Sequence, residues 1–263
     1  MSKAYTSNLT RDQFDLIAPL LPAAKPGGRP RSVCLQSILN AILYVVVQSC
    51  KWRDLPADFP AWSTAYTYFR NWRKDGTWQR VHDRIRGWTR ADAGRPESPS
   101  EVIIDSQSVP TPAMTNQAVG YDGAKKNKGR KRHAVVDTLG LVMMVVVTAA
   151  SVPERQGGQQ ALSKLKALGD TVSRLYLVWA DGGYSGQPFM KWVMDSLGWV
   201  LQVVLRPQQR QGFVLLKKRW VVERTFGWWQ WNRRLNVDYE RLPESAEAMI
   251  HIAMIRLMLR RLA

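Results

Sequence analysis

Apolar residues recur at helical spacing through the first ninety positions of the chain. Thr10 and Gln13 form the capping-box pattern that begins a helix, and Pro19 should end that helix early. A second helix with a wide apolar stripe should follow Ser32, because Ser is a good N-cap, and a third should follow Ser63 for the same reason. The pattern predicts a small all-helical region, with helices near residues 11–21, 33–46, 63–76 and 77–88.

Beyond a Gly- and Pro-containing linker at residues 91–100, the pattern changes to short apolar runs typical of strands. A turn with the sequence DTLG at 137–140 should join two of these strands as a hairpin. This order predicts an α/β fold with a mixed five-stranded sheet, in a domain over residues 93–263 that follows a helical domain over residues 1–92. The expected strands are 102–105, 132–136, 141–148, 175–180 and 199–205, and the expected helices are 159–168, 187–197, 217–234 and 245–262.

The charge balance points to a polyanionic partner. Lys and Arg number 38 against 21 Asp and Glu, which gives a net charge of +17 and an isoelectric point near 10.3. Nucleic acid is the first candidate. An anionic membrane is the rival, but the longest apolar runs fall well short of the ~20 residues that a membrane span requires. Cys34 and Cys50 form no disulfide framework or zinc-binding pattern, and no signal peptide opens the chain, so we expect a cytoplasmic protein without a membrane partner.

Three acidic residues stand in chemically distinct surroundings. Asp105 and Asp181 end apolar, strand-like runs, and Glu223 lies in a basic, aromatic helical segment. A carboxylate at the end of a buried strand is costly to desolvate unless a cation or hydrogen bonds satisfy it. In so basic a chain, such carboxylates favour divalent metal ions that face phosphates, which is the chemistry of nucleases and transposases. For Glu223 taken alone, a surface ion pair with Arg219 or Arg224 is an equally good explanation.

Several sequence motifs, in order along the chain, give it a family resemblance. They are AILY at 41–44, CKWRDLP at 50–56, WSTAY at 62–66, VIIDSQSV at 102–109, GRKRHAVVDTLGL at 129–141, LVWADGGYSG at 177–186 and RWVVERTFGW at 219–228. Together these motifs resemble those of the DDE transposases of bacterial insertion sequences, in the family-five group. The resemblance runs nearly end to end.

The resemblance implies a ribonuclease-H-like (RNase H-like) catalytic domain behind a helix-turn-helix-like DNA-binding domain. It implies that two Mg²⁺ ions, or Mn²⁺ in their place, are held by Asp105, Asp181 and Glu223, with Asp105 bridging both. The implied reaction is cleavage of double-stranded DNA at the terminal inverted repeats of the element, followed by joining of the freed 3′-hydroxyls to target DNA. Synapsis of two ends further implies a homodimer on DNA, associated with the bacterial nucleoid.

Basic residues near these acids are candidates for DNA contact. Arg219 resembles the arginine of the tyrosine-arginine-glutamate-lysine signature of these transposases, whose tyrosine and lysine positions hold Leu216 and Gln230 here. Arg233 and Arg234 could substitute for the missing lysine. Other candidates lie in residues 125–132 and on the third predicted helix, where a solvated charge run and a plain helical bundle are the competing explanations. These are Lys125, Lys126, Lys128, Arg130, Lys131, Arg132, Arg70, Arg73 and Lys74.

Two other functions fit the same features. A decayed transposase could act as a DNA-binding repressor without catalysis, a possibility that the departures at Leu216 and Gln230 raise. A stand-alone metal-dependent nuclease would cleave DNA without the joining step. Metal-dependent nicking excludes the first alternative, and joined DNA products exclude the second.

Overall fold

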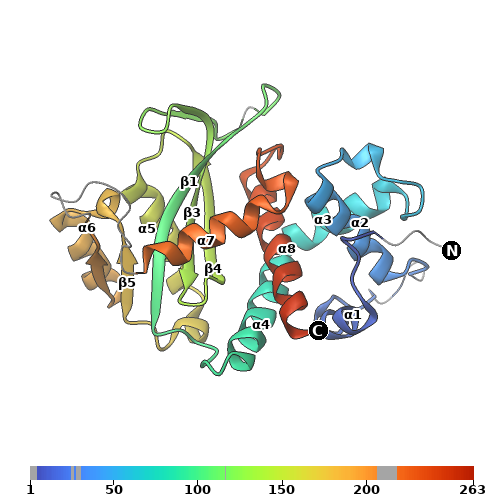
Figure 1. Cartoon of the computed structure of the whole chain (residues 1–263), viewed down its shortest axis with the longest axis horizontal. Coiled ribbons are helices and arrows are strands. Elements are labelled where there is room, and N and C mark those ends of the chain that lie inside the picture. Colours follow the sequence, from blue (N-terminus) through green and yellow to red (C-terminus); the bar gives the residue numbers. More distant parts are fainter. Residues whose placement is uncertain (1–4, 25–26, 28–30, 116, 206–217) are drawn as a thin grey trace.

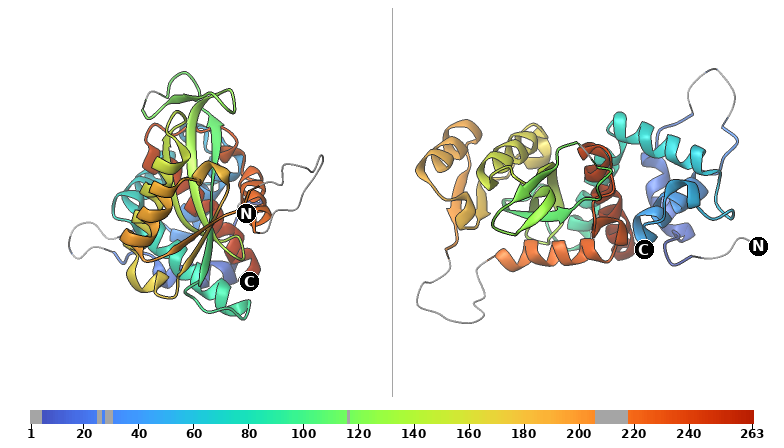
Figure 2. Two further views of the ribbon diagram at one scale, coloured as in Figure 1. Left: turned by 90° about the vertical axis from the view of Figure 1, so that its left-hand side faces the viewer. Right: turned by 90° about the horizontal axis from the view of Figure 1, so that it is seen from above.

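The computed structural model describes residues 5–24, 27, 31–115, 117–205 and 218–263. A group of helices from the start of the chain lies beside a mixed sheet that is flanked by helices (Figure 1). The last helix of the chain, α8 (Pro243–Leu262), lies between the two (Figure 2). The predicted α/β fold with an all-helical N-terminal region is confirmed.

Sequence signals determine where the first helix begins and ends. The Thr10 hydroxyl accepts a hydrogen bond from the Gln13 amide at 3.2 Å, which completes the predicted capping box of α1 (Arg11–Ile17). Pro19 lies in the short 3₁₀ helix η1 (Ala18–Leu20) that follows, so the expected early end of this helix is also confirmed.

The N-caps predicted for the next two helices are wrong. Cys34 precedes α2 (Leu35–Gln48), and neither Cys34 nor Ser32 caps it with a side-chain hydrogen bond. α3 (Trp62–Lys74) begins before Ser63, which therefore falls inside the first helical turn, where it cannot act as N-cap. α4 (Thr77–Asp92) completes the group.

The sheet contains six strands in the described part of the chain. They are β1 (Glu101–Pro110), β2 (Gly120–Asp122), β3 (Asn127–Asp137), β4 (Val142–Ala149), β5 (Leu177–Ala180) and β6 (Val200–Val203). The strand missed from the sequence is β2, because three residues are too few to show a periodic pattern. β1 also runs five residues beyond its predicted end, because polar residues at 106–108 pair with β3.

Strand order along the sheet is β2-β3-β1-β5-β6, and β4 also pairs with β3. β1, β2 and β4 are antiparallel to β3, whereas β1, β5 and β6 run parallel to one another. The sheet is therefore mixed, as predicted.

Helices cover both faces of this sheet. α5 (Glu154–Lys166) and α6 (Gln187–Trp192) pack in one core with Ile104 of β1, whereas α7 (Arg219–Gln230) and α8 pack in another with Ile103. Alternate residues of a strand face opposite sides, so Asp105 shares the α7 side with Ile103. Shorter helical turns are η2 (Trp52–Asp54), η3 (Gly169–Val172), η4 (Gly182–Tyr184), η5 (Val193–Leu197) and η6 (Arg233–Leu235).

The C-terminal helix α8 joins the N-terminal helices to the sheet. Its residues Ile252 and Ile255 belong to the same buried core as Ile42 of α2 and Trp78 of α4, and this core continues to Val145 of β4. At its other end, the Glu247 carboxylate accepts a hydrogen bond from the Val147 amide at 3.0 Å, which satisfies part of the open edge of β4. The division into units at residues 1–92 and 93–263 stays a prediction.

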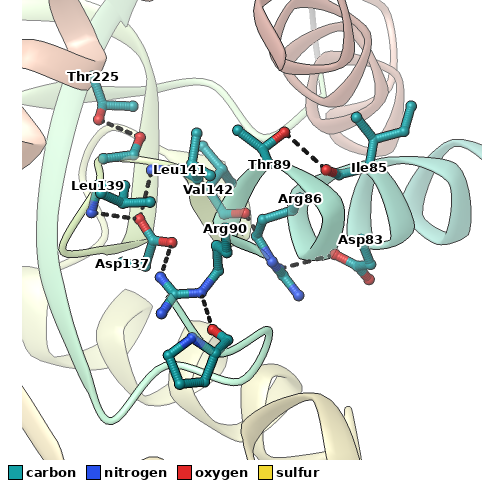
Figure 3. A network of polar contacts seen from close by, with 12 residues as sticks. Asp83, Ile85, Arg86, Thr89, Arg90, Asp137, Leu139, Leu141, Val142 and Thr225 are labelled. Atoms are coloured by element: carbon teal, nitrogen blue, oxygen red, sulfur yellow. Dashed lines mark hydrogen bonds and ion pairs between the residues drawn. The ribbon is translucent and has the colours of Figure 1, made fainter. Parts of the chain in front are cut away.

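A buried polar network ties α4 to the turn between β3 and β4 (Figure 3). The Asp137 carboxylate accepts hydrogen bonds from the amides of Leu139 at 2.9 Å and Leu141 at 2.8 Å, and it forms an ion pair with Arg90. Arg86, one turn earlier on α4, pairs with Asp83 at 3.0 Å. Asp137 is thus the turn residue that its sequence context suggests, and it also anchors the turn to α4.

Candidate active site

Strand register brings two of the predicted carboxylates together. In the parallel pair of β1 and β5, Glu101 lies opposite Leu177, a separation of 76 positions that also holds between Asp105 and Asp181. The two aspartates therefore occupy matching positions along neighbouring strands, with Asp181 directly after the last residue of β5. This places both just beyond the point where the pairing between β1 and β5 ends.

Asp105 is a half-buried carboxylate whose charge interacts with that of Asp181. Its Oδ1 accepts a hydrogen bond from the Ser106 amide at 2.7 Å. The pKa of Asp105 is raised to about 6, first by burial and then by the charge of Asp181, against opposing effects that include Arg219 and Lys125. Burial and the neighbouring carboxylate of Asp181 thus favour the protonated form of Asp105.

Asp181 is oriented by the turn that follows β5. Its Oδ1 accepts a hydrogen bond from the Gly183 amide at 2.9 Å and so caps the turn η4. A Cβ on Gly183 would lie 3.1 Å from this same oxygen and 3.4 Å from Cγ of Glu154. The glycine therefore leaves room for the two acidic side chains that approach here.

Arg219 lies between Asp181 and Glu223. Its Nη2 is 3.9 Å from Oδ2 of Asp181 and 3.5 Å from Oε1 of Glu223. Arg219 and Glu223 are four residues apart on α7 and share one helix face. The surface ion pair considered for Glu223 is thus present, and Arg219 also links Glu223 to Asp181. The Glu223 side chain is 56% exposed, so burial alone does not fix its position.

The donor chemistry of Asp105 and Asp181 fits a divalent cation. Carboxylate oxygens are ligands that Mg²⁺ prefers, and a cation there would offset both the burial and the charge of Asp181 that raise the pKa of Asp105. Across the residues for which the structure gives positions, however, no group of three or more His, Cys, Asp or Glu side chains is close enough to hold a metal ion. Glu223 is the predicted ligand that is not brought to the pair, because Arg219 stands between them.

The basic run at 125–132 divides into exposed and buried residues. Lys125 and Lys126 are exposed in the turn between β2 and β3, and Lys128 is exposed at the start of β3. Arg130, Lys131 and Arg132 are buried, so their prediction as DNA contacts is corrected. Both faces of β3 are covered in this region, and each of the three side chains has a partner inside the protein.

Internal partners account for these three buried cations. Arg130 contacts Asp238 at 3.2 Å and donates to the Glu240 carbonyl at 2.8 Å. Arg132 donates to the Leu235 carbonyl at 2.7 Å, and its guanidinium lies 5.9 Å from the ring centre of Trp229. Lys131 lies between Asp122 at 3.3 Å and Glu154 at 3.1 Å. These contacts tie β3 to the segments around it.

The remaining candidates are also divided. Arg70 and Lys74 are exposed on α3, whereas Arg73 is mostly buried and lies 3.9 Å from Glu244 of α8. Arg233 is exposed. Arg234 is buried against Glu240 at 2.8 Å, so its prediction as a DNA contact is corrected as well. Gln230 is exposed, and Leu216 lies outside the described residues.

A ladder of alternating rings and cations on α7 was missed from the sequence. The Arg224 guanidinium lies 4.6 Å from the ring centre of Trp220 and 4.8 Å from that of Trp228, and Arg261 of α8 stacks on the other side at 4.7 Å from Trp228. Trp220, Arg224 and Trp228 are each four residues apart and therefore share one helix face, a spacing from which their contacts could have been predicted. The contribution of Arg261 could not be read from the sequence, because it comes from a different helix.

The pKa of Asp105 gives a prediction for the metal-free protein. The native state holds its proton more tightly than the unfolded state does, so stability falls as pH rises from about 4 to about 6, and the cost is complete above that range. Replacing Asp105 by Asn should therefore stabilise the protein at pH 8, on the order of 2 kcal/mol. The gain should vanish near pH 4. Chemical unfolding in the presence of a chelator measures it, and an equal gain at both pH values would contradict the assignment.

No helix in the described part of the chain combines the length and apolar character that crossing a membrane would need.

Two family models match the chain, one in each half. A family model described as a transposase DDE domain matches residues 96–258, and one described as a putative transposase of the IS4/5 family matches residues 9–82. An uncharacterized 16.2 kDa protein of insertion element IS402 from Burkholderia cepacia is 37% identical over 104 residues, which are 36% of this chain and 68% of that protein. A putative transposase for insertion sequence element IS402 from the same organism is 31% identical over 136 residues, which are 49% of this chain and 60% of the relative.

Proposed function

Because the chain belongs to the DDE transposases of the IS4/5 family, we propose that it cleaves double-stranded DNA at the ends of an insertion sequence and joins the freed 3′-hydroxyls to target DNA. The observation that carries the proposal is the register match of Asp105 and Asp181 at one sheet edge. The link through Arg219 adds Glu223 as the third acid.

The three acids are proposed to hold two divalent cations, Mg²⁺ or Mn²⁺. Bound there, the ions would activate the attacking oxygen and stabilise the leaving oxygen of a phosphodiester. Asp105 is proposed as the shared ligand, since it is the carboxylate whose burial and neighbour raise its pKa most clearly. Arg219 is proposed to exchange its two carboxylate partners for a DNA phosphate, a ligand that its planar guanidinium matches well.

The exposed cations around this edge are proposed to position the DNA. Lys125, Lys126 and Lys128 lie at one turn of the same sheet, and the side chain of Lys125 donates to the Ser106 carbonyl at 3.0 Å, next to Asp105. A phosphate backbone that reaches Asp105 would therefore pass close to this turn. Such contacts fix the register of a duplex without reading its sequence.

Removing these cations should weaken DNA binding in a salt-dependent way. Lys126→Gln and Lys128→Gln should each lower the slope of log affinity against log salt by about one unit, because each lysine neutralises one phosphate. Titration of labelled DNA at several salt concentrations measures the slope. Lys191→Gln on α6, also exposed, is the matched control and should leave it unchanged. Equal slopes in all three variants would remove the turn from the DNA surface.

The helical region is proposed to recognise the terminal inverted repeats. The exposed residues Arg70 and Lys74 of α3 are the candidate contacts, together with the exposed Arg233 of η6. Synapsis of two ends would require two copies of the chain on DNA. We expect this assembly to work on the bacterial nucleoid, in the cytoplasm.

An inactive DNA-binding remnant is the second candidate, and Gln230 at the signature lysine position favours it. The distinguishing experiment incubates the protein with DNA that bears the element ends and with a target plasmid. Cuts at the ends together with joined products support a transposase. Cuts without joining indicate a nuclease, and binding without cuts indicates the remnant.

A further inference from the structure

The catalytic helix α7 is fastened to the turn between β3 and β4 at a point next to Glu223. Thr225 is fully buried, and its hydroxyl Oγ1 lies 2.7 Å from the carbonyl oxygen of Gly140 in that turn and 3.1 Å from the carbonyl oxygen of Val221 in α7, so Gly140 is the nearer of its two acceptors. The neighbouring Arg224 donates from Nη2 to the Leu139 carbonyl at 2.9 Å. Two consecutive residues of α7 therefore bond to two consecutive carbonyls of one turn (Figure 3 shows the contact of Thr225).

The turn that receives Thr225 is itself held rigidly. Asp137 accepts from the amides of Leu139 and Leu141 and pairs with Arg90 of α4 (Figure 3). Gly140 has φ of +80°, a conformation that favours glycine. A Cβ at this position would lie 2.9 Å from Oγ1 of Thr225 and 3.0 Å from the Trp228 ring. The backbone of the turn thus approaches α7 closely because position 140 has no side chain.

Glu223 depends on such a contact for its position. Its side chain is more than half exposed, and it forms an ion pair with Arg219 at 3.5 Å, on the same helix. An exposed side chain and an ion pair within the same helix do not hold α7 in place relative to β1, which contains Asp105, or β5, which Asp181 follows. Thr225 lies about 200° around the helix from Glu223, on the side that faces the sheet. A bond made there resists rotation of the helix that would move Glu223.

We propose that Thr225 is a positioning residue for Glu223, acting through its hydrogen bond to Gly140. The inference rests on the proposed function, because it assigns Glu223 to the catalytic site. Thr225 touches neither DNA nor the reacting atoms in this account. Its part is to set the rotation and the axial position of α7, so that Glu223 stays within reach of Arg219, the side chain that also contacts Asp181.

Three substitutions test the proposal. Thr225→Val keeps the branched shape of the side chain and removes the hydroxyl, and Thr225→Ser keeps the hydroxyl and removes the methyl group. Thr89→Val is the matched control, since Thr89 is also buried and its hydroxyl donates within α4, to the Ile85 carbonyl at 2.9 Å. All variants are assayed at a temperature where circular dichroism shows them folded.

Thr225→Val should lower the rate constant for end cleavage by about tenfold or more while leaving the Kd for end DNA unchanged, since small misplacements of a catalytic group are costly. Thr225→Ser should stay near the wild-type rate, and so should Thr89→Val. Cleavage by Thr225→Val at the rate of Thr89→Val would overturn the proposal. Equal loss in Thr225→Val and Thr225→Ser would also overturn it, because packing and not the hydrogen bond would then be responsible.

Hydrogen exchange supplies a readout that does not need activity. Amides of α7 should exchange faster in Thr225→Val than in Thr89→Val, measured without metal or DNA. Unchanged exchange in α7 would contradict the proposal even if the wild-type protein does not cleave DNA. A wild-type protein that fails to cleave, with faster exchange in Thr225→Val, would instead refute the proposed function and leave the fastening of α7 supported.

Discussion

Asp105→Asn is expected to abolish DNA strand cleavage while leaving binding to the element ends largely intact. The change removes one negative charge from the pair that strand register places at the sheet edge. An amide is a poor ligand for Mg²⁺ beside the carboxylate of Asp181, and metal ions contribute several kcal/mol of charge stabilisation in phosphoryl transfer. Because each 1.36 kcal/mol is a factor of ten in rate, we expect a loss on the order of 1000-fold.

The control for this experiment is an exposed aspartate away from the sheet edge. Asp170, in the short helix η3, is exposed, and Asp170→Asn should cleave at the wild-type rate. Cleavage is followed on labelled end DNA, and binding by the shift of the same DNA in a gel. If Asp105→Asn lost binding and cleavage to the same extent, its role would be structural and the assignment of the site would fail.

Asp137→Ala is expected to produce the largest loss of stability. Asp137 is fully buried, and it forms an ion pair with the Arg90 guanidinium while it accepts hydrogen bonds from two backbone amides. Removing one partner of a buried ion pair leaves the other charge uncompensated, which costs about 3–5 kcal/mol. That is a large share of the roughly 5–15 kcal/mol that holds a typical domain folded. Urea unfolding measures the change.

Two further variants test whether the buried charge is the cause. Arg84→Ala removes an ion pair with Glu97 at 3.7 Å in which both side chains are more than half exposed, and it should cost less than about 1 kcal/mol. Arg90→Met combined with Asp137→Asn removes both charges and keeps one acceptor for the turn, so it should recover much of the loss. Equal effects of Asp137→Ala and Arg84→Ala would show that the network contributes little.

The sequence singled out the two aspartates because each follows an apolar, strand-like run, although Asp105 lies inside β1. It could not show that the 76 positions between them match the register between β1 and β5. The α/β order was likewise readable from the change in periodicity near residue 100. The strand β2 could not be predicted, because three residues are too few to show a periodic pattern.

Exposure could not be predicted for each residue of the basic run at 125–132. Sequence alone marks Lys128 and Arg130 as equivalent, yet Lys128 is exposed and Arg130 is buried against Asp238. The difference depends on which segments cover β3, and Asp238 lies more than a hundred residues away along the chain. Thr225 was overlooked for a similar reason, because its acceptor belongs to a turn that only the folded chain brings to α7.

The central claim is that Asp105, Asp181 and Glu223 form a metal-dependent DNA cleavage site. It is tested most directly by incubating the wild-type protein with DNA that bears the ends of its element, with Mg²⁺ or with a chelator, and mapping the products to single nucleotides. We predict Mg²⁺-dependent cuts at the element ends and none with the chelator. Binding to the ends without cuts under either condition would contradict the claim and identify the chain as a DNA-binding remnant.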